Sequence, residues 1–331
     1  MLRFITFRLL QAIPVVFIVA AATFIMCRQI PGGPFDSEKP PPPEIKRQLE
    51  SFYGLNKPLG QQTLDYLWSI CPKKFMPHRL FLDANNDGRA DFDLKAAFGS
   101  DFGPSFKSVR TVNETIADSF PVSFQLGALA LMIALLLGIP AGVAAALRPN
   151  SWVDYFASGI SMLGVCVPTF VMGPILVLVF ALNLRWFNAS GWFDFKDQLL
   201  PSLTLGIAYA AYVARLTRGG MLEVLNQDFV RTARAKGASE SRVILRHALR
   251  GGLLPVISFL GPAAAGIITG SFVIETIFQV PGLGRHFVTS AFNRDYFLIT
   301  GTVVFYAALV VLFNLAVDVV QVWLNPKLKF E

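Results

Sequence analysis

The chain has 331 residues, of which 53% are hydrophobic and only 15% are charged, and its mean hydropathy is +0.52. Soluble domains carry about 25% charged residues, so this composition excludes an ordinary soluble protein and indicates a membrane protein. The net charge of +7 does not indicate nucleic-acid binding, because the excess of basic residues is concentrated in one short loop between apolar runs.

Six apolar runs have about the length that a helix needs to cross a bilayer, roughly 20 residues. The fourth is the weakest, since Pro201 and Arg215 bracket it closely. The alternative interpretation of the first run is a signal peptide. The run is longer than the apolar core of a signal peptide, and no small-residue cleavage site precedes Arg28, so an uncleaved span is favoured. We therefore predict an all-α polytopic protein with spans at about Leu9–Met26, Val122–Leu147, Ile160–Leu184, Leu199–Val213 lengthened by its flanks, Val256–Ile277 and Tyr296–Leu324.

Charge placement predicts the orientation of these spans. The loop from Arg215 to Arg250 carries eight basic and three acidic residues, whereas Cys27–Pro121 carries twelve of each. Basic residues in short loops mark the cytoplasmic side. We therefore expect the N-terminus, the basic loop and the C-terminus in the cytoplasm, with residues 29–120 and 275–295 outside. Five further basic residues fall on the cytoplasmic side in this arrangement: Arg3, Arg8, Arg148, Lys327 and Lys329.

Three parts follow along the chain. Residues 1–28 are predicted to be a membrane anchor, residues 29–120 an extracytoplasmic segment, and residues 121–331 a five-span body with a cytoplasmic loop at 217–255. The extracytoplasmic segment contains one cysteine, Cys71, and so has no internal disulfide.

Small residues gather in two of the predicted spans, within Gly138–Ala146 and Gly261–Gly270. Such residues let helices approach closely in a membrane. Ordinary tight packing is the favoured interpretation, and a translocation path lined by these spans is the alternative.

The extracytoplasmic segment also contains the pattern D-x-N-x-D-G-x-x-D. Oxygen ligands at alternate positions, with a glycine for the turn, suit a hard cation such as Ca²⁺. An EF-hand would need a glutamate where the chain has Leu94, so the pattern is closer to shorter, nine-residue calcium loops. A solvated turn is the alternative. The candidate Ca²⁺ ligands are Asp83, Asn85, Asp87 and Asp91.

The most distinctive segment is the basic run from Asp228 to Pro255, between two apolar runs. It predicts two short helices. Gly237 ends the first, because glycine accepts the left-handed conformation at a helix C-terminus, and Ser239 caps the second. The small residues near this turn leave a surface that a partner's groove can accept. A basic loop held by anionic lipid is an equally open alternative on physical grounds.

This loop resembles the cytoplasmic signature of ABC importer permeases, in which Glu-Ala-Ala is followed by three residues, a glycine and, later, a hydrophobic-x-Leu-Pro ending. Aligned on Gly237, the glutamate position holds Arg231, and the gap to Pro255 is longer. Both departures resemble the dipeptide/oligopeptide branch. So do GSFVIETIFQVPGLGRHF, FNRDYFLITG and NLAVDVVQVWLNPKLKF, and also IPGGP, where Gly33 replaces a usual aspartate.

The resemblance implies a type I ABC importer permease fold with six transmembrane helices and an insert between the first two. It implies one of two permease subunits of a di- or oligopeptide importer in a bacterial or archaeal cytoplasmic membrane. Its partners would be a sister permease, ATP-binding subunits, an extracytoplasmic substrate-binding protein and membrane lipid. The ATPase-coupling residues that it implies are Arg231, Thr232, Ala233, Arg234, Ala235, Lys236, Gly237 and Ala238.

The sequence has no phosphate loop of the form G-x-x-x-x-G-K-[ST]. ATP and Mg²⁺ are therefore expected on partner subunits, and the chain is expected to be a transport subunit without a required cofactor, not an enzyme. A membrane-embedded enzyme would need paired ionisable groups or a histidine cluster within the spans, and we find none in the sequence. The remaining alternatives are the same transporter class with another solute (a nickel chelate, glutathione or a sugar) and a non-transport membrane scaffold.

Three polar residues lie in the last two predicted spans. Asn314 and Asp318 are one turn apart; ionisable groups in spans are functional candidates, but a hydrogen bond to a neighbouring span is favoured here. For Glu275, contact with a peptide amine and a role in helix packing are equally open. The histidines lie far apart in the sequence and are not expected to form a metal site.

Overall fold

A computed structural model of the chain describes residues 2–30, 32–36, 41–73, 76, 81–82, 91–92, 95, 98–268 and 271–324. These residues are mostly helical and divide into two compact units, which we describe separately. The first unit consists of Met1–Ser123 and Pro281–Leu309, and the second of Phe124–Val280 and Val310–Glu331. Two long helices, α5 (Val112–Leu147) and α15 (Tyr296–Leu324), contribute to both units.

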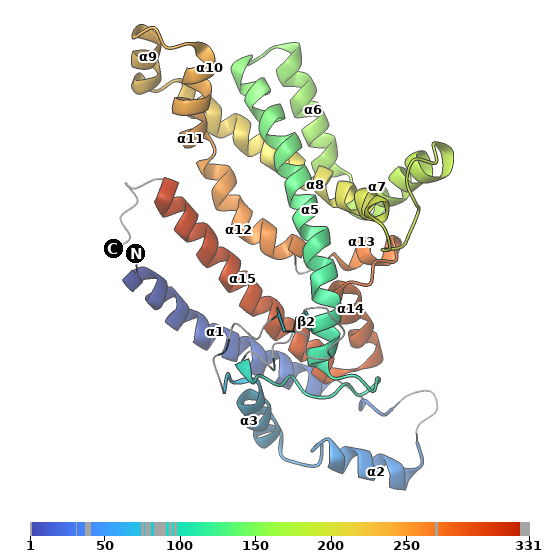
Figure 1. Ribbon diagram of the computed structural model, residues 1–331. Coiled ribbons are helices and arrows are strands. Elements are labelled where there is room, and N and C mark those ends of the chain that lie inside the picture. The colour runs from blue at the N-terminus through green and yellow to red at the C-terminus, as the bar shows by residue number, and fades with distance from the viewer. Residues whose placement is uncertain are drawn as a thin grey trace. The chain divides into compact units, whose positions relative to one another are not determined.

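The first unit surrounds an aromatic core. Phe24, Tyr66 and Phe305 are among its buried side chains, and the rings of Phe24 and Tyr66 stack with centroids 4.9 Å apart. The helices of this unit, besides parts of α5 and α15, are α1 (Leu2–Gln29), α2 (Pro43–Phe52), α3 (Leu59–Ile70) and α14 (Leu283–Asn293) (Figure 1).

The first unit also contains a short antiparallel pair of strands, β1 (Phe81–Leu82) and β2 (Asp91–Phe92), in which Phe81 is opposite Phe92. Of the candidate calcium ligands, Asp83, Asn85 and Asp87 lie outside the described residues, and only the backbone of Asp91 is described. The calcium loop therefore stays a prediction from sequence.

The second unit is a set of helices packed around α8 (Phe195–Leu225). Gly138 and Gly142 of α5 face this helix so closely that an added Cβ would lie 2.7 Å from the Ala210 carbonyl oxygen and 2.5 Å from that of Ala214, respectively. The predicted close packing of small residues is confirmed at this contact. The other elements are α6 (Trp152–Cys166), α7 (Thr169–Leu176), η2 (Val177–Asn183), α9 (Asp228–Ala235), α10 (Glu240–Arg242), η3 (Val243–Ala248), α11 (Leu249–Gly252), α12 (Leu254–Ile268) and α13 (Phe272–Ile277).

Among the described residues, five helices are long and apolar enough to cross a membrane, and a sixth span results if one bent pair is counted as a span. The bent pair corrects the prediction of a continuous span over Ile160–Leu184. Its first helix ends at Cys166, and the following helix, from Thr169, departs at 106°. Pro168 lies at this break, where its missing N–H and fixed φ end helix α6. The five unbroken spans are Thr6–Gln29, Val112–Leu147, Phe195–Leu225, Leu254–Ile277 and Tyr296–Val322.

Candidate functional site

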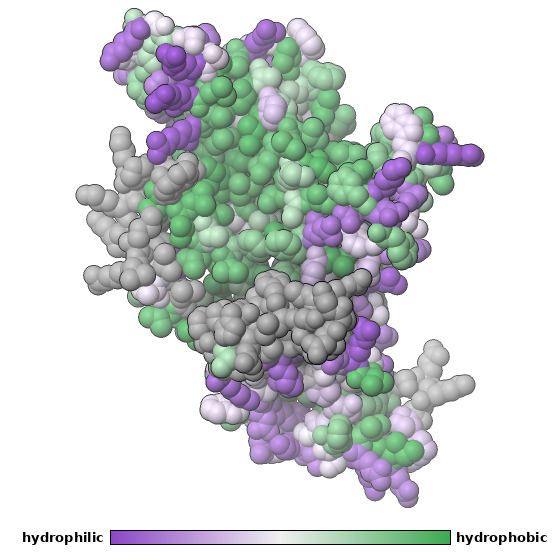
Figure 2. Space-filling view, viewed as in Figure 1, coloured by the Kyte–Doolittle hydropathy of each residue, from purple (hydrophilic) through white to green (hydrophobic). Residues whose placement is uncertain are grey.

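The predicted coupling residues form one short helix and the turn that ends it. Helix α9 runs from Asp228 to Ala235, directly after the end of α8. Figure 2 shows hydrophilic side chains gathered over α9 and α10, beside the largely hydrophobic surface of the other helices of this unit. The loop is therefore a polar protrusion from an apolar body.

Gly237 ends α9 as the sequence predicts. Its φ is +78°, in the left-handed region. Its N–H donates to the Arg234 carbonyl at 2.9 Å, and the Ala238 N–H donates to the Ala233 carbonyl at 3.2 Å. These two bonds form a complete Schellman motif, which satisfies carbonyl groups that the helix end would leave unpaired. Ser239 occupies the next N-cap position, but its side chain makes no capping bond.

The root of α9 is fixed by a hydrophobic cluster. Val230 is fully buried and packs with Met221 of α8 and Val243 of η3, both also fully buried. Ala233 and Ala238 pack against the same cluster. The small residues near the turn therefore divide into two groups, because these two face the cluster whereas Ala235 and Gly237 are exposed.

The outer side of the turn is held by a paired interaction. The Arg234 guanidinium donates from Nε to Glu240 Oε1 at 2.8 Å and from Nη2 to Oε2 at 3.3 Å. Arg231, whose side chain is 70% exposed, forms a 3.6 Å ion pair with Asp228, whose side chain is 96% exposed, so its guanidinium is accessible from solvent. With Thr232, Ala235 and Lys236 also exposed, the helix presents a basic, accessible face.

A groove of about 500 Å³ lies beside α9. Phe229 contributes to its wall and is 46% exposed. Other lining residues include Glu223 and Gln227 near the end of α8 and His247 and Pro255 on the elements that follow α9. The protruding helix is thus accompanied by a partly apolar hollow.

Backbone contacts connect this surface to the membrane helices. An added Cβ at Gly220 would lie 2.3 Å from the carbonyl oxygen of Gly252, and one at Gly252 would lie 2.6 Å from the Met221 sulfur. Helices α8 and α11 therefore touch with no room for a side chain between them. The hydrophobic cluster that anchors α9 therefore includes residues of the long helix α8.

An ion pair that the sequence analysis did not identify joins α6 to the same helix. Asp154 has a side chain only 3% exposed and accepts from Arg218 Nη2 at 2.7 Å and Nε at 2.5 Å. It also accepts from the N–H of Asn150, a residue with φ of +59°. The sequence contained a signal for this ion pair, because ionisable residues in or beside apolar spans need a partner. Arg218 also lines a cavity of about 530 Å³ between α5, α6 and α8.

Two other predicted residues are placed by the structure. The side chain of Glu275 is fully buried, so it is not accessible to a peptide amine in this conformation. Asn314 lies against α12, where an added Cβ at Gly261 would be 3.0 Å from its Oδ1. This contact supports a packing role for Asn314.

The fold is that of a type I ABC importer permease. In the solved structure "Inward facing conformations of the MetNI methionine ABC transporter", a chain aligns with a TM-score of 0.55 and 15% identity, over 64% of this chain and 97% of that chain. A chain of "Crystal structure of an amino acid ABC transporter with histidines" aligns with a TM-score of 0.50 and 15% identity, over 63% of this chain and 93% of that chain.

Family models and curated relatives identify the family. The model for "Binding-protein-dependent transport system inner membrane component" matches residues 138–330, and the corresponding N-terminal model matches residues 1–127. The oligopeptide transport system permease proteins OppB of Haemophilus influenzae and Escherichia coli K12 are each 45% identical over 333 residues, covering 100% of both chains. The dipeptide transport system permease protein DppB of Bacillus subtilis is 38% identical, covering 100% of this chain and 99% of its own. The chain belongs to the family of binding-protein-dependent transport system inner membrane components.

Proposed function

We propose that this chain is one of two permease subunits of an ATP-driven importer of di- or oligopeptides. The observation that carries the proposal is its 45% identity, over its whole length, to oligopeptide transport system permease proteins. The permease fold and the protruding basic helix α9 support it. ATP hydrolysis belongs, in this proposal, to partner subunits, and the chain supplies half of the translocation path.

The coupling surface in this proposal is the exposed side of α9 and its terminal turn. Arg231, Ala235 and Lys236 are available for contact because they are exposed. Arg234 keeps the turn rigid through Glu240. A stiff, protruding helix of two turns, anchored by Val230, fits the groove of an ATPase subunit better than a flexible basic loop would, because less ordering is needed on binding.

Transmission follows from the packing around α9. Closure of two ATPase subunits on ATP would move α9, and the cluster around Met221 would carry that movement into α8. The contact of Gly220 with Gly252 and the pairing of Arg218 with Asp154 connect α8 to α11 and α6. A partner can shift the permease between two conformations only if it binds one of them more tightly than the other. In this proposal, that difference in affinity arises because ATP changes how the ATPase subunits bind α9.

The basic loop and both termini are proposed to lie in the cytoplasm of a bacterial or archaeal cell. The proposed partners are a sister permease, ATP-binding subunits on the cytoplasmic side, and a substrate-binding protein on the extracytoplasmic segment at 29–120. The N-terminal anchor at 1–28 and the body at 121–331 are proposed to span the membrane. Calcium binding by Asp83, Asn85, Asp87 and Asp91 remains a proposal, tested by calorimetric titration of the full chain with Ca²⁺.

Uptake of a labelled tripeptide tests the proposed function. The assembled transporter, reconstituted with its binding protein, should import the peptide only with ATP. Import of a nickel chelate, glutathione or a sugar, with no peptide uptake, would replace peptides with that solute. The absence of ATP-dependent uptake of all of them would favour the scaffold alternative.

Substitutions on α9 test the coupling surface. Ala235→Trp places bulk on an exposed position, and Arg231→Glu reverses an exposed charge, so both should prevent ATPase binding while the chain still folds. Arg148→Glu, at an exposed residue after α5, is the matched control and should retain the complex. Normal ATPase binding and uptake in both α9 variants would show that the coupling surface lies elsewhere.

A further inference from the structure

A further pocket lies within the first unit. Its volume is about 230 Å³, and its wall comes from α1, α3, the turn between α2 and α3, residues 103–104 and the start of α15. One water occupies about 30 Å³ of liquid, so the pocket has the space of roughly eight waters. That is enough for one amino-acid residue and too little for a whole peptide.

Three side chains in its wall have buried polar atoms that find no hydrogen-bond partner among the described residues: Arg28 Nε, Gln62 Oε1 and Tyr66 Oη. Tyr66 is only 3% exposed. A buried polar atom without a partner destabilises the fold, and nearly all such atoms in proteins are paired. Three of them in one small pocket indicate a site shaped for a polar ligand.

The Arg28 guanidinium is held by aromatic rings. Its Cζ lies 4.9 Å from the ring centroid of Phe24 and 5.5–5.8 Å from those of Phe106, Tyr296 and Phe297. Cation–π contacts stabilise the charge through the ring faces and do not use the N–H donors. Within the described part of the chain, no carboxylate forms an ion pair with Arg28.

Among the residues that the structure describes, the pocket therefore carries one positive charge without a counter-charge. Its other cation, Lys57, is neutralised by Asp65 at 2.7 Å, and Asp65 also lines the pocket. Burial raises the pKa of the Tyr66 hydroxyl far above its usual value, so this group stays protonated and can donate a hydrogen bond. Besides the paired Lys57 and Asp65, the wall thus contains two donor groups without a partner, one of them cationic, and one acceptor without a partner, the Gln62 amide oxygen.

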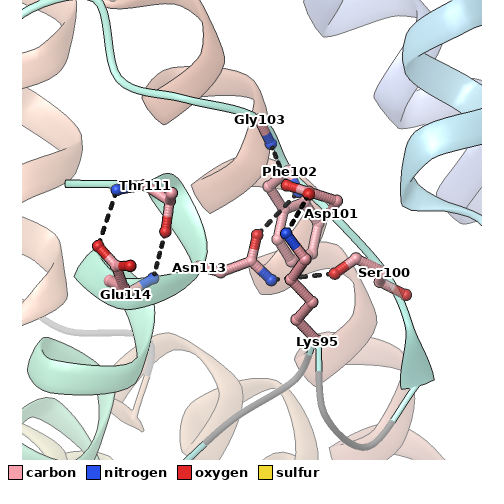
Figure 3. Close-up of polar contacts among 8 residues, drawn as sticks. All are labelled: Lys95, Ser100, Asp101, Phe102, Gly103, Thr111, Asn113 and Glu114. Atoms are coloured by element: carbon pink, nitrogen blue, oxygen red, sulfur yellow. Dashed lines mark hydrogen bonds and ion pairs between the residues drawn. The ribbon is translucent and has the colours of Figure 1, made fainter. Parts of the chain in front are cut away.

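The backbone that reaches the pocket at Gly103 is held by hydrogen bonds (Figure 3). Asn113 accepts from the Phe102 N–H at 2.9 Å and donates to the Ser100 carbonyl at 3.0 Å. Asp101 accepts from the Gly103 N–H at 3.0 Å. These bonds fix the backbone that forms one side of the pocket before any ligand arrives, which lowers the ordering cost of binding.

We propose that this pocket binds the C-terminal residue of a peptide, with Arg28 and Tyr66 donating to its carboxylate and Gln62 accepting from its last amide N–H. A peptide terminus offers this combination, because its carboxylate and its N–H are attached to the same Cα. The aromatic rings accommodate an apolar side chain on that residue. The inference rests on the proposed peptide import and names the part of the peptide that the permease recognises.

Calorimetric titration with tri-leucine and with its C-terminal amide tests the site in the assembled transporter in lipid nanodiscs. The free acid should bind at least about tenfold more tightly than the amide, since a hydrogen bond to a charged group is lost. Tyr66→Phe should weaken binding of the acid about tenfold and weaken binding of the amide less, because the hydrogen bond to the amide carbonyl is not to a charged group. Arg28→Gln should remove the preference for the acid.

The control is Arg110→Gln, which changes a first-unit cation that is paired with Asp118 and is not part of the pocket wall; it should alter affinity less than about twofold, as expected of an exposed pair. Tyr66→Phe deletes a hydroxyl that is unpaired in the free chain, so the melting temperature should not fall. Loss of the acid preference without loss of stability therefore reports a ligand contact and not misfolding.

Equal binding of acid and amide to the wild type, or unchanged acid binding in Tyr66→Phe, would overturn the site and leave Arg28 as part of a structural aromatic cluster. No binding of tri-leucine to a transporter that imports it would do the same. A wild-type transporter that imports no peptide would instead overturn the proposed function, so the two failures are distinguishable by uptake.

Discussion

Arg218 and Asp154, 64 positions apart, form a two-bond ion pair between α8 and α6, with Nη2–Oδ2 at 2.7 Å. The Asp154 side chain is 3% exposed and that of Arg218 is 33% exposed. Removing Arg218 leaves a buried carboxylate with no counter-charge, which in fully buried pairs costs 3–5 kcal/mol. Because Arg218 is partly exposed to solvent, we expect Arg218→Gln to cost about 2–3 kcal/mol, measured as a lower melting temperature of the purified chain in detergent.

The control for this prediction lies one turn away on the same helix. Arg215 is exposed and lines the same cavity as Arg218. Arg215→Gln should change stability by less than about 0.5 kcal/mol, as for most surface substitutions. Equal destabilisation by the two changes would mean that helix charge, and not the pair with Asp154, is responsible.

The glycine contact between α5 and α8 gives a second prediction. At Gly142 an added Cβ would meet the Ala214 carbonyl oxygen and the Thr217 Cβ, both at 2.5 Å. Gly142→Ala should cost about 1–3 kcal/mol by overpacking, although alanine favours helix formation. At Gly159 of α6 nothing lies within 4 Å, so Gly159→Ala should be neutral or stabilising by up to about 1 kcal/mol. Thermal unfolding of both variants in detergent checks the difference, and equal melting temperatures would contradict it.

Hydropathy locates the spans but predicts their length and direction less well, since the run Leu199–Val213 lies within the longer helix α8, Phe195–Leu225. The last span, Tyr296–Leu324, has in the structure the bounds that its apolar run predicts. The run Ile160–Leu184 is equally apolar but bends by 106° after Cys166. The mean hydropathy of a run carries no information about the direction of the helix axis. The signal was Pro168 itself, whose effect within a membrane depends on whether neighbouring helices satisfy the freed backbone groups.

The local turn at Gly237 was predictable because its cause is local. A glycine after a short helix needs no distant partner to adopt a left-handed conformation. The aromatic surroundings of Arg28 were not predictable in this way, since Phe106 and Phe297 come from distant parts of the sequence. The same holds for Asp154 and Arg218. From the sequence, such residues are recognised as ionisable groups that need a partner. The sequence does not identify which residue the partner is.

The network around Asn113 gives a third prediction. Asn113 is 8% exposed and uses both its amide oxygen and its amide nitrogen. Asn113→Asp keeps an oxygen that accepts from the Phe102 N–H. It replaces the NH₂ group that donates to the Ser100 carbonyl with a second oxygen, which repels that carbonyl. We therefore expect faster amide hydrogen exchange at Phe102 and Gly103. Arg110→Gln removes an exposed ion pair with Asp118 and should leave that exchange unchanged. Unchanged exchange in the Asn113 variant would show that the wall is held by other contacts.

The end of α9 gives the last prediction, in which one type of substitution has opposite effects at two sites. Neither Gly237 nor Gly219, in the interior of α8, has an atom within 4 Å of an added Cβ, so sterics favour neither site. Gly237 has φ of +78°, a conformation that costs an L-residue about 1–2 kcal/mol, whereas a helical Gly219→Ala gains about 0.5–1 kcal/mol. Gly237→Ala should therefore loosen the Schellman turn and weaken ATPase binding severalfold, and Gly219→Ala should not. Gly237→Asn should recover part of the affinity, because asparagine tolerates this conformation. Affinity of the purified ATPase for each variant measures the effect, and equal weakening by alanine and asparagine would show that the loss of glycine itself, and not the backbone conformation, matters at this turn.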